Sequence, residues 1–133
     1  MASIHVNGID LYYEVHGSGM PLVMLHGNGE DHTTFSTLCA ALQDRFQIFL
    51  FDTRGHGKST PVSEYHYSDM AQDMTEALIQ LFDGPIDLLG FSDGGIIALF
   101  LAIWYPQLVR RMILCGANYH PYGIKEEGRR DMR

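Results

Sequence analysis

Basic residues are scarce in this sequence, and their scarcity excludes one class of partner. Nine Lys and Arg residues stand against sixteen Asp and Glu residues, which gives a formal net charge of -7. Proteins that bind nucleic acid draw much of their affinity from clustered Lys and Arg side chains that neutralise phosphates. We therefore expect no nucleic-acid partner.

Long apolar runs are also missing. The longest covers residues 96–105, whereas a membrane-spanning helix needs about 20 apolar residues. Residues 1–15 contain no basic region followed by an apolar stretch, which is the pattern of a secretory signal peptide. We expect a protein that makes no contact with a membrane and resides in the cytoplasm.

Cysteine is the third scarce residue type. Cys39 lies on an amphipathic stretch and Cys115 ends an apolar one, far away in the sequence. We predict two buried free thiols rather than a disulfide. Nothing in their placement indicates a metal site or a redox cofactor, and we expect neither.

Apolar residues, in contrast, make up 46% of the 133 residues, enough to fill the core of one domain. Two short strands joined by Asn7-Gly8 predict a hairpin, and continuous apolar runs predict strands that are covered on both faces. Between these runs, apolar residues recur at helical spacing and predict helices. Asp31 and Thr33 or Thr34 are the expected caps of one helix, and Ser68 is the expected cap of the next. The expected strands are residues 4–6, 11–15, 21–25, 47–51, 86–89 and 112–115, and the expected helices are 35–42, 69–82 and 96–105. This alternation predicts an α/β fold with a mostly parallel sheet and helices on both faces.

The most informative motif is Gly90-Phe91-Ser92-Asp93-Gly94, between an expected strand and an expected helix. A serine on a sharp strand-to-helix turn projects its hydroxyl outward, and glycines two residues away let the strand and helix pass closely. The same five residues occur by chance in ordinary glycine turns. The flanking strand and helix favour an activated nucleophile at Ser92.

Four signals together resemble the N-terminal half of an α/β-hydrolase. They follow four successive expected strands: His26-Gly27-Asn28-Gly29, the segment from Asp52 to Ser59, the Ser92 turn, and Gly116-Ala117-Asn118. The resemblance covers nearly the whole chain. It implies the first six strands of that fold, so that residues 1–133 are the N-terminal portion of a single domain without its cap and C-terminal part.

The resemblance also implies roles for the two glycine-rich turns. Ser92 would be the catalytic nucleophile, and two backbone N–H groups would form the oxyanion hole. One belongs to Asp93; the other belongs by position to Asn28, with Gly29 as the alternative. Gly27, Gly29, Gly90 and Gly94 support these loops.

Other polar residues of these segments are expected to be structural. We expect His26 to support its loop by hydrogen bonds to local backbone and to transfer no proton. In the segment from Asp52 to Ser59, neither Asp52 nor His56 is expected to react, because its side chains can hydrogen-bond their own turns. Residues 64–67 are expected to form an exposed loop.

A serine nucleophile also needs a base and a carboxylate that orients it. The only histidine after Ser92 is His120, which we expect near the start of a cap segment. The acids after Ser92 are Asp93, Glu126, Glu127 and Asp131. The resemblance places the acid and the histidine after later strands. We therefore expect a missing C-terminal segment or a companion chain to supply both, and this chain alone to be inactive.

Two hypotheses of function follow. The first is a serine hydrolase that acts on a small apolar acyl substrate, such as a carboxylic ester, lactone, thioester or amide. Serine in place of aspartate at position 92 argues against dehalogenase and epoxide hydrolase chemistry, whereas perhydrolases and carbon-carbon bond hydrolases share the serine. The second hypothesis is a noncatalytic, hydrolase-like protein that binds a small ligand.

Overall fold

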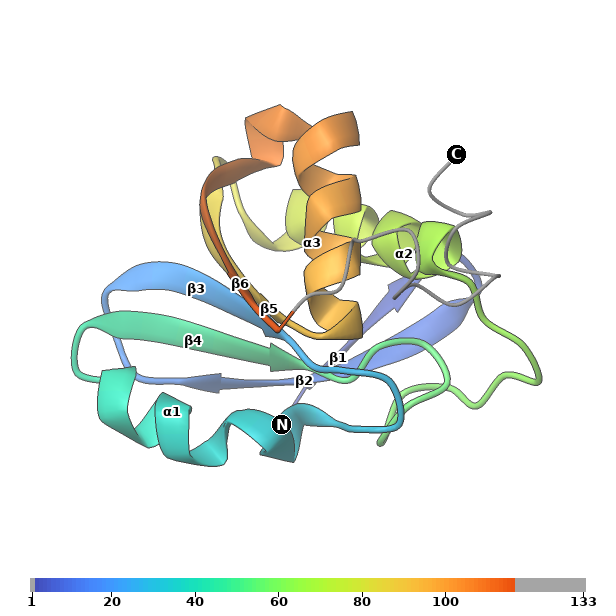
Figure 1. The fold of residues 1–133 in the computed structure, drawn as a ribbon, viewed down its shortest axis with the longest axis horizontal. Coiled ribbons are helices and arrows are strands. Elements are labelled where there is room, and N and C mark those ends of the chain that lie inside the picture. Colours follow the sequence, from blue (N-terminus) through green and yellow to red (C-terminus); the bar gives the residue numbers. More distant parts are fainter. Residues whose placement is uncertain (1, 117–133) are drawn as a thin grey trace.

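The computed structural model describes residues 2–116, which build one six-stranded sheet between two helical layers (Figure 1). The elements in chain order are β1 (Ala2–Val6), β2 (Ile9–His16), β3 (Met20–Leu25), the 3-10 helix η1 (His32–Phe35), α1 (Ser36–Leu42), β4 (Phe46–Phe51), α2 (Tyr67–Leu81), β5 (Ile86–Phe91), α3 (Asp93–Trp104), the 3-10 helix η2 (Pro106–Leu108) and β6 (Val109–Cys115). The predicted α/β class is confirmed.

The strands lie in the order β1-β2-β4-β3-β5-β6. The first two form the predicted antiparallel hairpin, with Asn7 and Gly8 both at positive φ, as a tight two-residue turn requires. The strands β4, β3, β5 and β6 are parallel. Because β3 and β5 are neighbours, the loops that follow them meet at one edge of the sheet.

The two faces of the sheet carry separate apolar clusters. On one face α2 and α3 pack against the strands through residues such as Met74, Leu78 and Ile97, all nearly inaccessible to solvent. On the other face η1 and α1 contribute Phe35 and Cys39 to a smaller cluster. Figure 1 shows α1 on the opposite side of the sheet from α2 and α3. The predicted covering of both faces is therefore confirmed.

Two helix starts differ from the prediction. The helix α2 begins at Tyr67 rather than Asp69, so Ser68 lies in its first turn and His66 occupies the N-cap position. The Tyr67 side chain is buried in the core, and this packing stabilises the additional residues at the start of the helix. The helix α3 begins at Asp93, because the glycines of the Ser92 turn adopt helical backbone instead of lengthening the turn.

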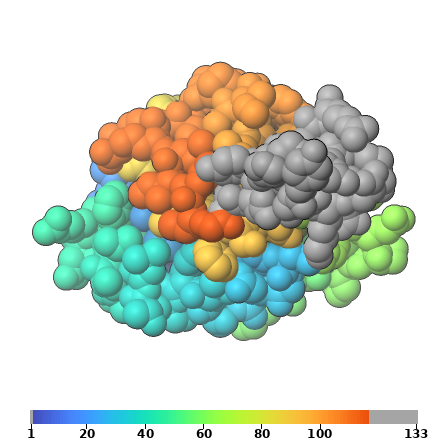
Figure 2. Space-filling model, viewed as in Figure 1, coloured from blue at the N-terminus to red at the C-terminus, as the bar shows by residue number. Residues whose placement is uncertain are grey.

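The strand β6 ends the sheet order of the described residues and is only partly covered. Ile113 is 56% exposed, and a groove of about 590 Å³ runs beside it toward α1. Figure 2 shows the red-orange atoms of this strand at the surface above α1. The prediction of a buried Cys115 is wrong, since this edge leaves the thiol exposed, whereas Cys39 is buried as predicted. Both thiols are free.

Within residues 2–116, each helix is too short or too polar to cross a membrane.

Candidate active site

Ser92 sits on a strained turn between β5 and α3. Its φ of 55° and ψ of -116° are values that a residue with a side chain seldom adopts. Such a conformation costs about 1–3 kcal/mol and persists only where the surroundings enforce it. Here the Ser92 N–H donates to the carbonyl of Cys115 at 2.9 Å, and the Ser92 carbonyl accepts from the Gly95 N–H at 2.9 Å. The backbone is thus held from both sides.

The glycines at both ends of the motif leave room for this turn. A Cβ atom on Gly94 would lie 2.1 Å from the carbonyl oxygen of Leu25, and one on Gly90 would lie 2.5 Å from the carbonyl oxygen of Gly94. Both obstacles are backbone atoms, which cannot rotate away. The structure therefore agrees with the close strand-helix approach inferred from the sequence.

The loop after β3 lies directly beside the serine. A Cβ atom on Gly27 would come within 3.3 Å of the Ser92 Cβ and 2.7 Å of a Glu30 carboxylate oxygen. The loop and the turn are adjacent because β3 and β5 are parallel neighbours whose carboxyl ends coincide. A side chain at position 27 would separate the loop from the serine.

Most backbone N–H groups of this loop are already bound. The Gly27 N–H donates to Glu30 Oε1 at 2.8 Å, the Gly29 N–H to His56 Nε2 at 3.0 Å, and the Glu30 N–H to the Gly27 carbonyl at 3.2 Å. For the Asn28 N–H, the described part of the chain offers no acceptor. Of the two candidates that the sequence left open, Gly29 therefore has an N–H that is already bonded to His56, whereas the N–H of Asn28 is available to a ligand.

The N–H of Asp93 is available for a different reason. Asp93 is the first residue of α3, and the first N–H groups of a helix have no intrahelical acceptor. They also lie at the positive end of the helix dipole. Asp93 directly follows Ser92 at the start of α3, and Asn28 directly follows Gly27, the loop residue that lies against the Ser92 side chain.

His26 is buried under the loop and bonded at both ring nitrogens. Its Nδ1 lies 2.7 Å from the Gly27 carbonyl, and its Nε2 accepts from the Thr53 N–H at 3.1 Å. This pattern fits a neutral ring that carries its proton on Nδ1, and burial lowers the pKa of His26 in the same sense. The local backbone bond was expected, whereas the bond to Thr53 was not visible in the sequence.

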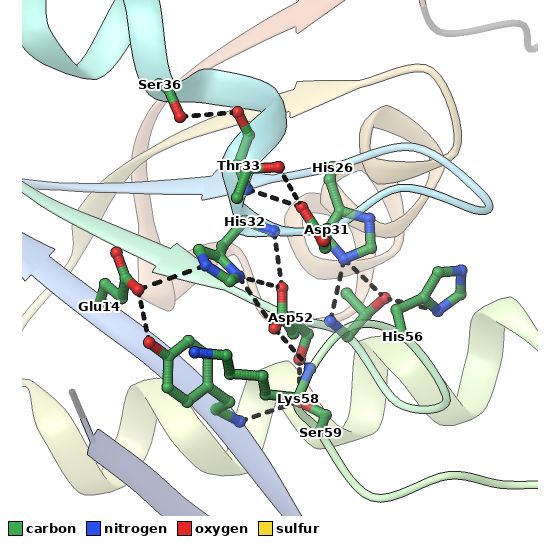
Figure 3. A network of polar contacts seen from close by, with 12 residues as sticks. Glu14, His26, Asp31, His32, Thr33, Ser36, Asp52, His56, Lys58 and Ser59 are labelled. Carbon is green, nitrogen blue, oxygen red and sulfur yellow. Dashed lines mark hydrogen bonds and ion pairs between the residues drawn. The ribbon is translucent and has the colours of Figure 1, made fainter.

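Asp52 holds the neighbouring loops together, as Figure 3 shows. One carboxylate oxygen accepts from the His32 N–H at 2.6 Å, and the other accepts from the Lys58 N–H at 2.8 Å. The Ser59 hydroxyl donates to the Asp52 carbonyl and accepts from the Tyr12 N–H. These contacts give Asp52 the structural role expected of it.

The same network reaches β2 through His32. Its Nδ1 lies 2.9 Å from Asp52, and its Nε2 lies 3.3 Å from a carboxylate oxygen of Glu14. The Tyr12 hydroxyl donates to Glu14, and this bond raises the pKa of Tyr12 to about 12 and lowers that of Glu14. The network thus stiffens the base of the loop that carries Asn28.

Three of these residues could be considered for a metal ion. Ligand atoms of Asp31, His32 and Asp52 lie within 4.8 Å of one another. The Asp31 carboxylate, however, caps η1 by accepting from the Thr33 N–H at 2.8 Å, and Asp52 accepts two backbone N–H bonds. Since these oxygens already accept backbone N–H bonds, the group suits a structural cluster better than a metal site.

A small cavity of about 240 Å³ adjoins the two free amides. It is lined by Asn28, Ser63, Glu64, Tyr65, His66, Tyr67 and Asp93. The expectation of an exposed loop over residues 64–67 is wrong in part: Tyr67 is buried in α2, and Tyr65 reaches the loop after β3. Its hydroxyl donates to Asn28 Oδ1 at 2.6 Å. The sequence offered no spacing that could have revealed this contact.

No described histidine contacts the Ser92 hydroxyl. His120, Glu126, Glu127 and Asp131, named above as the later histidine and acids, lie outside the described residues, as do Ala117 and Asn118. Within residues 2–116 the site therefore consists of a strained serine and two adjacent amides.

Comparison with known proteins shows the family to which the chain belongs. The model of the family described as alpha/beta hydrolase fold matches residues 20–132. The chain belongs to the α/β-hydrolase family. It is 34% identical to the protein named serine hydrolase BPHL from Mus musculus, over 96% of this chain and 46% of that protein. The chain spans about half the length of such relatives, or less.

Solved structures of α/β-hydrolases agree with the fold. A thermophilic esterase from Thermogutta terrifontis superposes with a TM-score of 0.81 at 30% identity, over 90% of this chain and 45% of that chain. The epoxide hydrolase CorEH superposes with a TM-score of 0.80 at 29% identity, over 85% of this chain and 40% of that chain. The fold of this half is thus shared by enzymes of different chemistry, and the site must distinguish them.

Proposed function

We propose that the full-length protein is a serine hydrolase that cleaves a carboxylic ester, lactone or related acyl substrate through an acyl-enzyme on Ser92. One observation carries the proposal: Ser92 occupies a strained turn at positive φ, beside two N–H groups without acceptors in the described residues. Strain of this kind clusters at active sites, because ordinary turns avoid it. The family supports hydrolase activity in general, and the ester-like substrate is our inference.

The proposed reaction proceeds in two steps. The Ser92 Oγ bonds to the substrate carbonyl carbon, and a base accepts the hydroxyl proton. The negative charge that develops on the carbonyl oxygen is stabilised by the N–H groups of Asn28 and Asp93. The bond to the leaving oxygen then breaks as that oxygen takes up the proton. Water repeats the sequence on the acyl-enzyme and frees Ser92.

The base and its orienting acid belong, in this proposal, to the part of the protein that follows the described residues. Residues 1–133 would be the N-terminal portion of one domain, completed by a C-terminal segment or a companion chain. A cytoplasmic location is part of the proposal, and the two free thiols support it, since free cysteines are typical of reducing compartments.

A serine at position 92 also favours acyl transfer over other reactions that members of this family catalyse. Similarity to the fold of an epoxide hydrolase does not show that this chain catalyses the same reaction. A serine oxygen forms an acyl-enzyme, whereas epoxide hydrolases and dehalogenases of the family use a carboxylate nucleophile. For the substrate we propose a small, largely apolar acyl group. Tyr65 and Tyr67 line the cavity beside the amides. The carboxylates of Glu64 and Asp93 line it too and would repel an acyl group that carries a negative charge of its own.

The test is covalent labelling of the full-length protein with a fluorophosphonate. Mass spectrometry should place the adduct on Ser92, and Ser92→Ala should reduce ester turnover by several orders of magnitude. Ser18→Ala is the matched control, because Ser18 is an exposed serine of a distant loop. Labelling of another residue with Ser92 unmodified would refute the proposal. A folded protein that binds a small ligand without labelling would favour the noncatalytic alternative.

A further inference from the structure

Asn28 contributes a side chain as well as an N–H group, and within residues 2–116 the side chain has one hydrogen-bond partner. The Tyr65 hydroxyl donates to Asn28 Oδ1 at 2.6 Å. Tyr65 is 37 residues away in the sequence and half-buried, in the loop that precedes α2. The bond therefore joins two loops, and both of its residues line the cavity beside the free amides.

His56, which binds the next residue of the loop after β3, also contacts Tyr65. The Gly29 N–H donates to His56 Nε2, and the His56 Nδ1 lies 3.0 Å from the Arg54 carbonyl, which fixes the proton on Nδ1. The Tyr65 ring meets the His56 ring edge-on, with ring centres 4.9 Å apart. Tyr65 and His56 are thus in contact with each other and hydrogen-bond two consecutive residues of the loop after β3, Asn28 and Gly29.

The chain leaves room for this pair of side chains at Gly55. A Cβ atom there would come within 3.2 Å of the Tyr65 ring and 2.9 Å of Val62, and its φ of 77° is one that glycine adopts readily. A larger residue at position 55 would therefore push the Tyr65 ring away from the position in which its hydroxyl reaches Asn28.

We propose that Tyr65 is a positioning residue for the Asn28 amide, acting through the Asn28 side chain; the proposal rests on the function proposed above. The Asn28 N–H has no acceptor in the described chain, so nothing bonded to that N–H fixes its direction before substrate arrives. Its orientation is set by what holds the residue on either side. Preorganised donors of this kind stabilise the transition state because they need no rearrangement during the reaction.

The experiment uses the full-length protein and p-nitrophenyl acetate. Tyr65→Phe keeps the ring on His56 and removes only the hydroxyl, and we expect kcat to fall about tenfold with KM within about twofold, since an oxyanion donor acts mainly in the transition state. Asn28→Ala should cause a similar loss. The double variant should lose no more than either single variant.

A second measurement follows the loop itself. Amide hydrogen exchange of the peptide that contains residues 26–30 should accelerate in Tyr65→Phe, because the loop loses one of its attachments. Tyr105→Phe is the matched control: Tyr105 is the C-cap residue of α3, at the other end of that helix from Ser92. It should change neither kcat nor exchange in this peptide.

The outcomes separate the two proposals. A labelled Ser92 with unchanged kcat or unchanged loop exchange in Tyr65→Phe would refute the positioning role alone. A rise in KM with constant kcat, or additive losses in the double variant, would also refute it and make Tyr65 a substrate contact. Absence of Ser92-dependent turnover in the wild-type protein would refute the proposed function, and the positioning role with it.

Discussion

Substitution of Gly94 by alanine should damage both the fold and the reaction. The new Cβ would lie 2.1 Å from the Leu25 carbonyl oxygen, 2.5 Å from the Leu25 carbonyl carbon and 2.7 Å from the His26 carbonyl oxygen. All three are backbone atoms, so α3 and the end of β3 must separate by roughly 1 Å before the closest contact reaches an ordinary distance. Overpacking of this kind costs about 1–3 kcal/mol, and we expect the free energy of unfolding to fall by that amount.

The same displacement should reduce turnover further than stability alone explains. Leu25 ends the strand that leads into the loop of Asn28, whereas Gly94 follows Asp93 in the first turn of α3. Moving α3 off β3 therefore moves the Asn28 amide relative to Ser92. A misplacement of about 1 Å can cost about 100-fold in rate, and we expect kcat/KM for p-nitrophenyl acetate to fall by that order.

Urea unfolding and ester hydrolysis of the full-length protein measure the two effects. Gly84→Ala is the matched control, since a Cβ on Gly84 meets no atom within 4 Å. It should leave both measurements near the wild-type values. Wild-type stability and turnover in Gly94→Ala would show that strand and helix do not need the close approach, and the argument for the Ser92 turn would fail.

Three further predictions concern other parts of the molecule. Replacing the amide of Asn28 by an ester should lower turnover about 100- to 1000-fold; unchanged turnover in a folded variant would transfer the role to Gly29 or remove it from the loop. The Arg110 guanidinium holds the pKa of the buried Asp87 carboxyl at about 2. This depressed pKa contributes stability above about pH 4 that is lost as the pH falls toward 2, so Asp87→Asn should lower the free energy of unfolding at pH 7 by about 1–2 kcal/mol after allowance for solvent screening. The difference should narrow between pH 4 and 3 in urea unfolding, and a constant difference would contradict the assignment. Residues 1–133 purified alone should aggregate or unfold without cooperativity and show no turnover that depends on Ser92, because β6 exposes an apolar edge; a stable, active monomer would contradict this.

The strands and the serine turn could be predicted because they depend on local patterns. Continuous apolar runs mark strands buried on both faces, and Asn7-Gly8 carries its own turn geometry. Gly90 and Gly94 report a close approach because no other residue fits there. In each case the physical cause lies within a few residues.

Contacts between distant segments could not be predicted in the same way. The bond from Tyr65 to Asn28 depends on how the loop before α2 folds back, and the bond from His26 to Thr53 depends on the register of β3 and β4. The exposure of Cys115 depends on which strand ends the sheet. These properties arise from topology, and no short stretch of sequence encodes them.

The hydrogen bond from the Ser92 N–H to the Cys115 carbonyl carries a mechanical consequence. It joins the proposed nucleophile to Cys115, the last residue of β6, which ends the sheet order of the described residues. A strand at such a border fluctuates more than one with neighbours on both sides. If the proposed C-terminal segment or companion chain pairs with β6, it would therefore steady the backbone of Ser92 as well as cover apolar surface, so assembly of the domain and ordering of its proposed nucleophile would be coupled.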